Sequence, residues 1–498
     1  MDQLRFDSLG YSSDGFVDTP AIDWIRGMGV DFENAYTSAP SCIPARASLM
    51  TGQNPWTTGV LSTGVSAGPD KYGSCMGVNF AHTLAGELVK NGYHAEGIGK
   101  MHFFPQRAEM GFSHILLDES GREEDKWFCS DYKTWFMKNN PQRNNITDHG
   151  IHWNSWMARP FDADECYHPS NWTANETLDY LRRRDPTKPF FINMSFSRPH
   201  SPYDASPYFF DMYMAKKEEL PKPVFSPWDE KYADNGDDNI MAWRGTRTDE
   251  EYKRMRAGYF GSITQTDYQI GKVLTWLNKA KLLDEMLIVF TADHGDMLGD
   301  HHLFRKSYAY EASTHIPMLI KLPKSLGSKL KTVETAVTIT DVMPTILSVL
   351  GIDIPDGVEG KDVSPLIFGE DIGREYVTTE HTETFDKLED HFTVTDGKYK
   401  YVWKYKANEE VFFDLTENKR EDNNEINNPK FKDIIASMRE YAVSELSKRN
   451  SDEITFVKDS KLVPVPKDAF VVSPNYIKRL ETSEFNWMKD TRTNETII

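Results

Sequence analysis

Five consecutive residues near the start of the sequence, Cys42-Ile43-Pro44-Ala45-Arg46, place a thiol and a guanidinium at the start of an expected helix. Pro44 suits a first helical turn, and the good helix formers after it lead to a stop signal at Gly52. Unpaired N–H groups and the helix dipole favour a bound anion and a thiolate there. The segment predicts a reactive cysteine beside an anion site, and a small buried thiol beside a surface arginine is an equal alternative.

A second chemical segment, Asp293-His294-Gly295-Asp296, directly follows an apolar run. Carboxylate and imidazole donors at such a turn suit a divalent cation. Asp2 and Gln3 stand where a first strand would end, and they would add oxygen ligands. A cation held there would polarise the oxygens of a bound anion and offset negative charge in a transition state.

Three basic segments offer further donors. Lys100-Met101-His102 places its lysine and histidine on one side of an extended segment. His200 is flanked by prolines, whose fixed torsions suit a positioned acid, and Lys306 follows an arginine. Each segment has an ordinary alternative, namely a surface lysine, a capping or turn histidine, or a solvated charge pair. The segments therefore indicate a site only when they are taken together.

Apolar runs with helical segments between them must position these groups. Strands are expected at His94–Ile98, Phe190–Phe196 and Met286–Thr291, preceded by helices at Thr83–Asn91, Asn175–Arg184 and Gly258–Ala280. This alternation is typical of a parallel sheet wound with helices, in which ligands bind beyond the carboxyl ends of the strands. Those ends carry the Lys100, His200 and Asp293 segments. We therefore expect three distant segments to meet at one edge of the sheet.

The later part of the chain changes character. A strand at Ile316–Leu322 and a helix at Asp341–Leu350 are expected to complete the first part, and the aromatic segment Pro202–Arg247 is expected to pass over the functional edge. Antiparallel strands are then expected at Phe392–Thr395, Tyr399–Trp403 and Glu410–Leu415, followed by a helix at Asp433–Ser447. The pattern predicts a smaller α+β subdomain after a large α/β part.

Composition limits the classes of partner. The 498-residue chain carries a formal net charge of −19, which argues against a nucleic-acid partner because phosphate binding needs a basic face. The sequence contains no apolar stretch long enough to span a bilayer. Its cysteines are too widely spaced for a disulfide scaffold or a zinc knuckle: Cys42, Cys75, Cys129 and Cys166.

Taken in order, these segments resemble the formylglycine-dependent sulfatases of the alkaline phosphatase superfamily. The matching pieces are the Cys42–Gly52 run, Gly99-Lys100-Met101-His102, Pro199-His200, Asp293-His294-Gly295 and Lys306. The C-x-P-x-R run followed by Ala-Ser-Leu-Met-Thr-Gly is highly specific for that family. The resemblance implies an α/β fold with a large mixed, mostly parallel sheet flanked by helices over residues 1–368. It also implies a C-terminal α+β subdomain over residues 369–498, with a small antiparallel sheet, a helix and a tail.

The resemblance also implies a mechanism. A formylglycine-generating maturation enzyme would convert Cys42 to formylglycine, whose hydrated aldehyde attacks sulfur and gives a covalent sulfo-enzyme. Arg46 would anchor the hydrated aldehyde, and Lys100 would bind the nucleophile and the sulfate. His102 would be the base that triggers sulfate release. His200 and Lys306 would hold sulfate oxygens and protonate the leaving oxygen.

The family's cation is usually calcium, and its ligands map to Asp2, Gln3, Asp293 and His294. Gln3 replaces a second aspartate that many members carry, and His294 stands where others have asparagine. These departures leave manganese and magnesium open. The basic groups of the site would focus a positive potential into one pocket of an acidic protein.

The family also implies a periplasmic or secreted location, although the sequence shows no signal peptide. Because no apolar strand precedes Asp2, we expect the natural chain to begin upstream of Met1.

The expected substrate is a sulfate ester. An O-sulfated carbohydrate is favoured, because Trp228, Trp243 and the C-terminal His381 would line an open cleft. Aryl and choline sulfates are alternatives, as is a phosphonate monoester hydrolase or phosphodiesterase of the same superfamily. The Lys100-x-His102 pair favours the sulfatase, since the phosphonate enzymes lack it. A catalytically silent sulfoglycan-binding protein is disfavoured, because every candidate catalytic residue is present.

Overall fold

The computed structural model describes residues 1–63, 80–103, 106–122, 128–143, 145–146, 149–234, 239–416, 419–451 and 454–476. Cys75 and the end of the expected C-terminal tail, residues 477–498, lie outside the described residues. Cys42, Cys129 and Cys166 are free thiols, and only the first of these three is buried. The described cysteines therefore form no disulfide with one another.

The centre of the molecule is a mixed sheet whose two halves are tied together by the first residues of the chain. One half has the parallel order β4 (His114–Leu117), β3 (His94–Gly99) and β5 (Phe190–Ser195). The other has the order β6 (Ile288–Thr291), β8 (Met318–Lys321), β1 (Val30–Phe32) and β9 (Thr332–Val333), with both antiparallel and parallel pairing. The Asp2 amide donates to Phe196 O at 3.0 Å, and the Met1 ammonium donates to Thr291 O at 2.9 Å. This bridge fixes Asp2 between the ends of β5 and β6.

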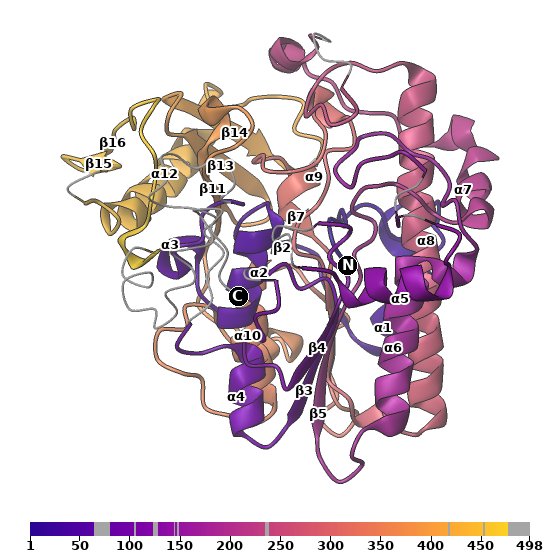
Figure 1. Ribbon diagram of the computed structural model, residues 1–498. Helices are drawn as coiled ribbons and strands as arrows, with labels where there is room; N and C mark the ends of the chain where they lie inside the picture. Colours follow the sequence, from indigo (N-terminus) through magenta and orange to yellow (C-terminus); the bar gives the residue numbers. More distant parts are fainter. Residues whose placement is uncertain are drawn as a thin grey trace, which may run out of the picture.

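Helices cover both faces of this sheet (Figure 1). On one side lie α2 (Cys42–Thr51), α4 (Leu84–Lys90) and α10 (Val342–Val349); on the other lie α1 (Pro20–Met28), α6 (Pro169–Arg183) and α8 (Asp249–Lys279). The other helices in the described residues before 369 are α3 (Pro55–Thr58), α5 (Asp131–Asn139), α7 (Pro207–Met214), α9 (Glu311–Thr314) and α11 (Ser364–Ile367). None of the helices in the described ranges is long and apolar enough to cross a membrane.

A cavity of about 720 Å³ lies along β5 and β6. Side chains from both strands line it together with apolar residues of the helices, such as Leu84, Leu274 and Ile346. In the described part of the chain the two strands belong to separate hydrogen-bonded groups. The contacts of Met1 and Asp2 are therefore what join the two halves of the sheet near the site.

Two expected elements differ from the observed ones for local reasons. The single strand expected at Ile316–Leu322 is divided into β7 (His315–Ile316) and β8, because Pro317 between them has no N–H for a strand ladder. β7 pairs with β2 (Ala35–Tyr36), whereas β8 pairs with β1 and β6. The long helix α8 begins earlier than expected, at a capping box in which Thr248 and Glu251 bond to each other's backbone N–H groups.

The C-terminal region forms its own antiparallel sheet, as the sequence pattern predicts. Its order is β11 (Val377–His381), β12 (His391–Thr395), β13 (Tyr399–Lys404) and β14 (Glu409–Asp414), and α12 (Lys432–Ser447) packs on it (Figure 1). Shorter strands are β10 (Val337–Thr338), β15 (Val457–Lys458) and β16 (Lys461–Leu462). Trp403, Phe412 and Met438 belong to the hydrophobic cluster between sheet and helix. The boundary between residues 368 and 369 stays a prediction.

A buried lysine joins this second sheet to the first part of the molecule. Lys400 of β13 is fully buried, and its Nζ lies 2.5 Å from Glu311 Oε1 and 2.9 Å from Glu421 Oε1. The same ammonium donates to Ala309 O at 3.0 Å. Buried charges are stable only when they are paired, so this cluster holds the two parts in one register.

We expect Lys400→Met to lower the free energy of unfolding by about 3–5 kcal/mol, because two carboxylates would stay buried without their counter-charge. Urea denaturation followed by tryptophan fluorescence measures this loss. Lys324→Met is the matched control: its ammonium pairs with Asp284 at 3.1 Å on the surface, and only a small change is expected. Equal losses in the two variants would contradict the role given to Lys400.

Candidate active site

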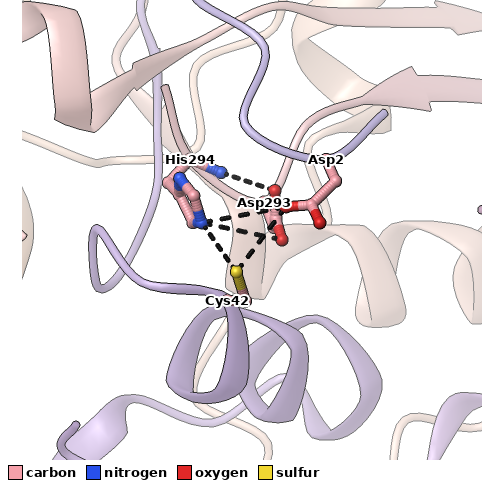
Figure 2. A group of neighbouring side chains, drawn as sticks. All are labelled: Asp2, Cys42, Asp293 and His294. Atoms are coloured by element: carbon pink, nitrogen blue, oxygen red, sulfur yellow. Dashed lines mark hydrogen bonds and ion pairs between the residues drawn. The ribbon is translucent and has the colours of Figure 1, made fainter. Parts of the chain in front are cut away.

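Cys42 is the first residue of α2, and its side chain points from the helix N-terminus into a group of acidic and imidazole side chains (Figure 2). Pro44 lies in the first turn, and Gly52 ends the helix in the left-handed conformation with φ 64°, as the sequence predicts. Cys42 is 1% exposed and Arg46 is 6% exposed. Arg46 is therefore not a surface arginine. This excludes the alternative of a buried thiol beside a surface arginine.

Three distant segments meet around Cys42. Its Sγ lies 3.1 Å from His294 Nε2 and 3.6 Å from Asp2 Oδ1 (Figure 2). Asp293 and His294 follow directly after β6, and Asp2 comes from the N-terminal bridge. Ligand-type atoms of these four buried residues lie within 4.8 Å of one another. Of the three segments expected to meet at one edge of the sheet, this group contains the Asp293 segment, together with Asp2 and Cys42.

This donor set fits a divalent cation. His294 Nδ1 lies 2.8 Å from Gly295 O, which directs Nε2 toward the two carboxylates. Two buried carboxylates and one imidazole in contact are the donors that bind such ions. Gln3, the remaining expected ligand, uses its Oε1 to accept a 2.6 Å hydrogen bond from Lys306, so its contact with a metal stays a prediction.

Basic side chains surround the carboxylates. Arg46 donates through Nε to Asp293 Oδ2 at 3.0 Å and through Nη1 to Ser195 Oγ at 3.0 Å. Lys100 is completely buried and forms an ion pair with Asp2. These contacts neutralise charges that burial alone would make costly.

Lys306 faces the sulfur directly. Its Nζ lies 3.3 Å from Cys42 Sγ. Burial and the Asp2 carboxylate raise the pKa of the Cys42 thiol, whereas the ammonium groups of Lys306 and Lys100 lower it. The net result is a pKa below that of an ordinary thiol. A negative charge at position 42, or on a ligand beside it, is therefore favoured.

His102 lies just beyond β3 in a left-handed conformation with φ 56°. Its backbone N–H donates to Glu119 Oε1 at 2.8 Å, and its buried Nδ1 has no hydrogen-bond partner within the described ranges. Burial lowers the pKa of His102, and the charges of Arg122 and Lys100 lower it further. The ring is therefore neutral near neutral pH and able to accept a proton.

His200 is also a neutral imidazole. Its Nδ1 lies 2.7 Å from Ser201 O, which leaves Nε2 as the ring nitrogen available to a ligand. Burial lowers the pKa of His200, and the nearby charges of Lys100 and Lys306 lower it further. A bound anion between these groups would oppose that effect.

The segment that carries His200 is fixed by a buried network. Arg198 donates to both oxygens of Asp204, at 2.6 and 2.9 Å, and His149 Nε2 lies 3.2 Å from Asp204 Oδ2. All three side chains are buried. The network holds the backbone on both sides of His200, so Asp204 is a positioning residue.

His381 ends β11 and is 1% exposed, and neither ring nitrogen has a hydrogen-bond partner in the part of the chain that the structure describes. Burial lowers its pKa, and the neighbouring His391 and His294 lower it further. The effect of His294 on the pKa of His381 indicates that the C-terminal sheet lies near the site. The predicted contact of His381 with substrate stays a prediction.

The two tryptophans expected in an open cleft differ in their surroundings. Trp228 packs against Phe413 and Tyr310, with ring centroids 5.6 and 5.9 Å apart, and so belongs to a hydrophobic cluster. Trp243 lines an open pocket together with Phe385. Both tryptophans are half-buried and pack against the same cluster, and Trp243 is the one of the two that lines a pocket.

Sequence reasoning missed several supporting residues. Asp296 accepts hydrogen bonds from the Gln3 amide and from Tyr203 OH, and it was visible only as the last residue of the D-H-G-D run. Ser195 and Glu119 bind Arg46 and the His102 backbone. No local pattern indicates these two contacts, because each joins segments that are separated along the chain.

A sheet that gathers a buried thiol, metal-type donors and cations at its carboxyl edge defines a hydrolase of anionic esters with an alkaline-phosphatase-like fold. The sequence matches the family described as Sulfatase over residues 1–352, and N-sulphoglucosamine sulphohydrolase, C-terminal, over residues 299–449. The chain belongs to the sulfatase family and is a sulfuric ester hydrolase.

One relative agrees with this assignment, and two solved structures share the fold. The chain is 39% identical over 463 residues to an arylsulfatase of Clostridium perfringens, covering 90% of this chain and 93% of the relative. Its fold is similar to that of the phosphonate monoester hydrolase of Agrobacterium radiobacter, with a TM-score of 0.74, 21% identity and coverage of 93% and 98%. A protein solved in complex with its substrate D-glucosamine-2-N,6-O-disulfate gives a TM-score of 0.69, 19% identity and coverage of 90% and 96%.

We expect Asp204→Asn to destabilise the protein at neutral pH, by about 3 kcal/mol, because Arg198 would lose its buried counter-charge. Although burial raises the pKa of Asp204, Arg198 and His149 hold it well below its ordinary value. Such a carboxylate stabilises the fold above its unfolded pKa of about 3.9 and loses this effect as the pH falls. The difference between wild type and variant should therefore be largest above about pH 5 and shrink below about pH 4.

Urea unfolding at several pH values measures this difference. Asp179→Asn removes an exposed partner of Arg183 and serves as the control, with a small effect expected at each pH. A loss for Asp204→Asn that did not change with pH would show that its charge is not what stabilises the segment.

Proposed function

We propose that the protein removes sulfate from an O-sulfated carbohydrate, with residue 42 acting as the nucleophile after conversion to formylglycine. The observation that carries the proposal is the position of Cys42 Sγ, 3.3 Å from Lys306 Nζ and 3.1 Å from His294 Nε2, at a helix N-terminus. A sulfate placed beside this atom would meet cations and N–H groups rather than carboxylates alone.

Conversion of Cys42 is supported by the C-x-P-x-R run and by the chemistry of the second half-reaction. As formylglycine, residue 42 would supply a hydrated aldehyde, whose second hydroxyl lets the covalent sulfate leave; a thiol lacks that hydroxyl. Because Cys42 is 1% exposed, a maturation enzyme would have to reach it before this part of the chain folds.

The charged groups have separable roles in the proposal. Lys306, next to residue 42, would bind a sulfate oxygen and hold the proton destined for the leaving oxygen. Lys100 would bind sulfate from the Asp2 side. His200, whose Nδ1–H donates to Ser201 O, would donate a hydrogen bond through Nε2 only once it is protonated beside the bound anion. His102, kept neutral by burial, would accept the proton when sulfate leaves.

Arg46 would orient the nucleophile from within α2. Its Nε bond to Asp293 and its Nη1 bond to Ser195 fix the guanidinium against the end of β6 and the end of β5. A group on residue 42 one helical turn earlier lies on the same side of the helix. The guanidinium can therefore hold that group in one rotamer.

A divalent cation would be held by Asp2, Asp293 and His294, with Gln3 as a further ligand. We propose calcium, because oxygen donors dominate the set; the imidazole keeps manganese, and magnesium, as alternatives. When bound, the cation would polarise the sulfate oxygens and stabilise developing negative charge.

A carbohydrate is proposed as the alcohol part because Trp243 and Phe385 offer aromatic surface at an open pocket, which suits the faces of sugar rings. The solved neighbour with D-glucosamine-2-N,6-O-disulfate shows that a protein of this fold accepts a sulfated sugar. We also propose a periplasmic or secreted location, because that is the usual location in this family.

A phosphonate monoester hydrolase is the second candidate, favoured by the fold shared with the Agrobacterium radiobacter enzyme. The Lys100-x-His102 pair argues for the sulfatase, and both side chains lie buried at the end of β3. Relative turnover of 4-nitrophenyl sulfate and a phenylphosphonate ester decides between them. Faster cleavage of the phosphonate would overturn our first choice.

We expect Cys42→Ala to reduce sulfate-ester hydrolysis by at least about a thousandfold, because the nucleophile is lost. Cys166→Ala, which removes an exposed thiol, is the control and should keep full activity. Mass spectrometry of the peptide containing residue 42 should show the aldehyde in protein from its own host. An unmodified cysteine in protein without activity would favour a silent sulfoglycan-binding protein.

We expect a chelator followed by gel filtration to lower both kcat and the melting temperature, because a cation bound to the folded site stabilises it by mass action. Adding back calcium, manganese or magnesium identifies the ion that restores both values. Full activity in protein shown to be metal-free by elemental analysis would rule out the cation site.

A further inference from the structure

An open pocket of about 410 Å³ lies beside the segment that leads to Lys306. Trp243 and Arg244 form one wall, the loop 385–388 forms another, and Lys467 and Asp468 close it. Phe304 N donates to Trp243 O at 2.9 Å, and Arg244 and Leu303 form an antiparallel bridge. The wall of this pocket is therefore attached directly to the chain that enters the sulfate-binding position.

Four side chains stack through this wall. The guanidinium carbon of Arg244 lies 5.0 Å from the centre of the Trp243 ring. The Trp243 and Phe385 rings are nearly parallel, at 10°, with centroids 6.0 Å apart. The guanidinium carbon of Arg305 lies 4.4 Å from the centre of the Phe385 ring. Two cations thus end an aromatic stack.

Arg305 is exceptional among the buried arginines of the described residues. Each of the others lies within 4 Å of a carboxylate: Arg5, Arg46, Arg122, Arg198, Arg256 and Arg449. Arg305 is 4% exposed, its Nη2 donates to Met241 O at 2.6 Å, and its Nε has no hydrogen-bond partner among the described residues. Asp296 acts on it only from beyond ion-pair distance.

A buried cation without a counter-charge costs free energy, so folds retain one where it binds something. Its neighbour Lys306 is a second buried cation, which contacts Gln3 and Cys42 and has no carboxylate within ion-pair distance among the described residues. The proposed function gives it a sulfate. Arg244, held by Lys231 O at 3.0 Å, adds a third positive group at the pocket. In a protein of net charge −19, this accumulation points to an anion.

We propose that Arg305 and Arg244 bind a second anionic group, a carboxylate or a second sulfate, on the alcohol part of the ester. The planar fork of a guanidinium matches either group. Trp243 and Phe385 would pack against the ring that carries it, and Phe385, 45% exposed, would turn aside to admit the anion to Arg305. This inference rests on the proposed function and narrows its substrate class to sulfated sugars with a further negative charge.

The test uses pairs of sulfated mono- and oligosaccharides whose members differ only by one additional sulfate or one uronate carboxylate. Wild-type protein should have the higher kcat/KM on the doubly anionic member of each pair. Arg305→Met should reduce the ratio of kcat/KM on that member to kcat/KM on the other member at least about tenfold. Arg305→Lys should retain part of the preference. Arg254→Met is the matched control: Arg254 also stacks on a ring, Phe210, and bonds a backbone carbonyl, and its ratio should equal that of wild type.

Stability separates recognition from a structural role. Arg305→Met should unfold at the same or a higher urea concentration than wild type, whereas Arg198→Met should unfold earlier, because only Arg198 has a buried carboxylate partner. Comparing substrate pairs that differ by a sulfate with pairs that differ by a carboxylate shows which of the two anions is bound.

Two outcomes would overturn the inference: a wild-type protein without preference for the doubly anionic member of any pair, or an Arg305→Met variant with an unchanged ratio. Hydrolysis of 4-nitrophenyl sulfate by wild type, with no sugar cleaved, would also count against it. Failure of the proposed function is distinguishable, since wild-type protein would then hydrolyse no sulfate ester at all.

Discussion

The site depends on the pairing of charges in a place from which water is excluded. Asp2 and Asp293 are buried carboxylates, and Lys100 and Arg46 are the buried cations that meet them. None of these charges is stable there without its partner, so each ion pair also holds together the two segments that carry it. The N-terminal bridge, α2, the end of β3 and the end of β6 are thereby locked together. The same pairing keeps the carboxylates close enough to one another to hold a cation.

Charge that remains after this pairing is what gives the site its chemistry. The molecule as a whole is acidic, yet Lys306 and Arg305 are consecutive buried cations without a carboxylate partner in the described ranges. Positive groups enclosed by low-dielectric walls focus the field into a small volume, and they need no reorganisation when an anion arrives. Neutral His102 and His200 complete the arrangement, because imidazoles whose pKa is lowered can exchange protons without adding a fixed charge.

Rigid support comes from a second layer of polar contacts. Tyr259 donates to Gln3 O at 2.7 Å, and Asp296 binds the Gln3 amide nitrogen, so the Gln3 oxygen is turned toward Lys306. The Arg198–Asp204 pair fixes the backbone beside His200 in the same way. These supporting groups come from the strand ends and from α8, which are held by the core. Hydrogen bonds of this kind fix the orientation of the side chains in the site, while the ion pairs hold the segments that carry them together.

The sequence by itself determined the local features: the helix that begins at Cys42 and stops at Gly52, the strands that end before Lys100 and Asp293, and the antiparallel C-terminal sheet. Short-range rules fix these, because prolines, glycines and apolar periodicity act over a few residues. Only the tertiary structure decided that Trp228 packs against Phe413, that Pro317 separates β7 and β8, which pair with different strands, and that Glu119 binds the backbone of His102. It also decided that Arg305 alone among the described buried arginines lacks a carboxylate within ion-pair distance. Whether a charge is paired depends on distances between segments far apart in the chain, and no local pattern encodes those distances.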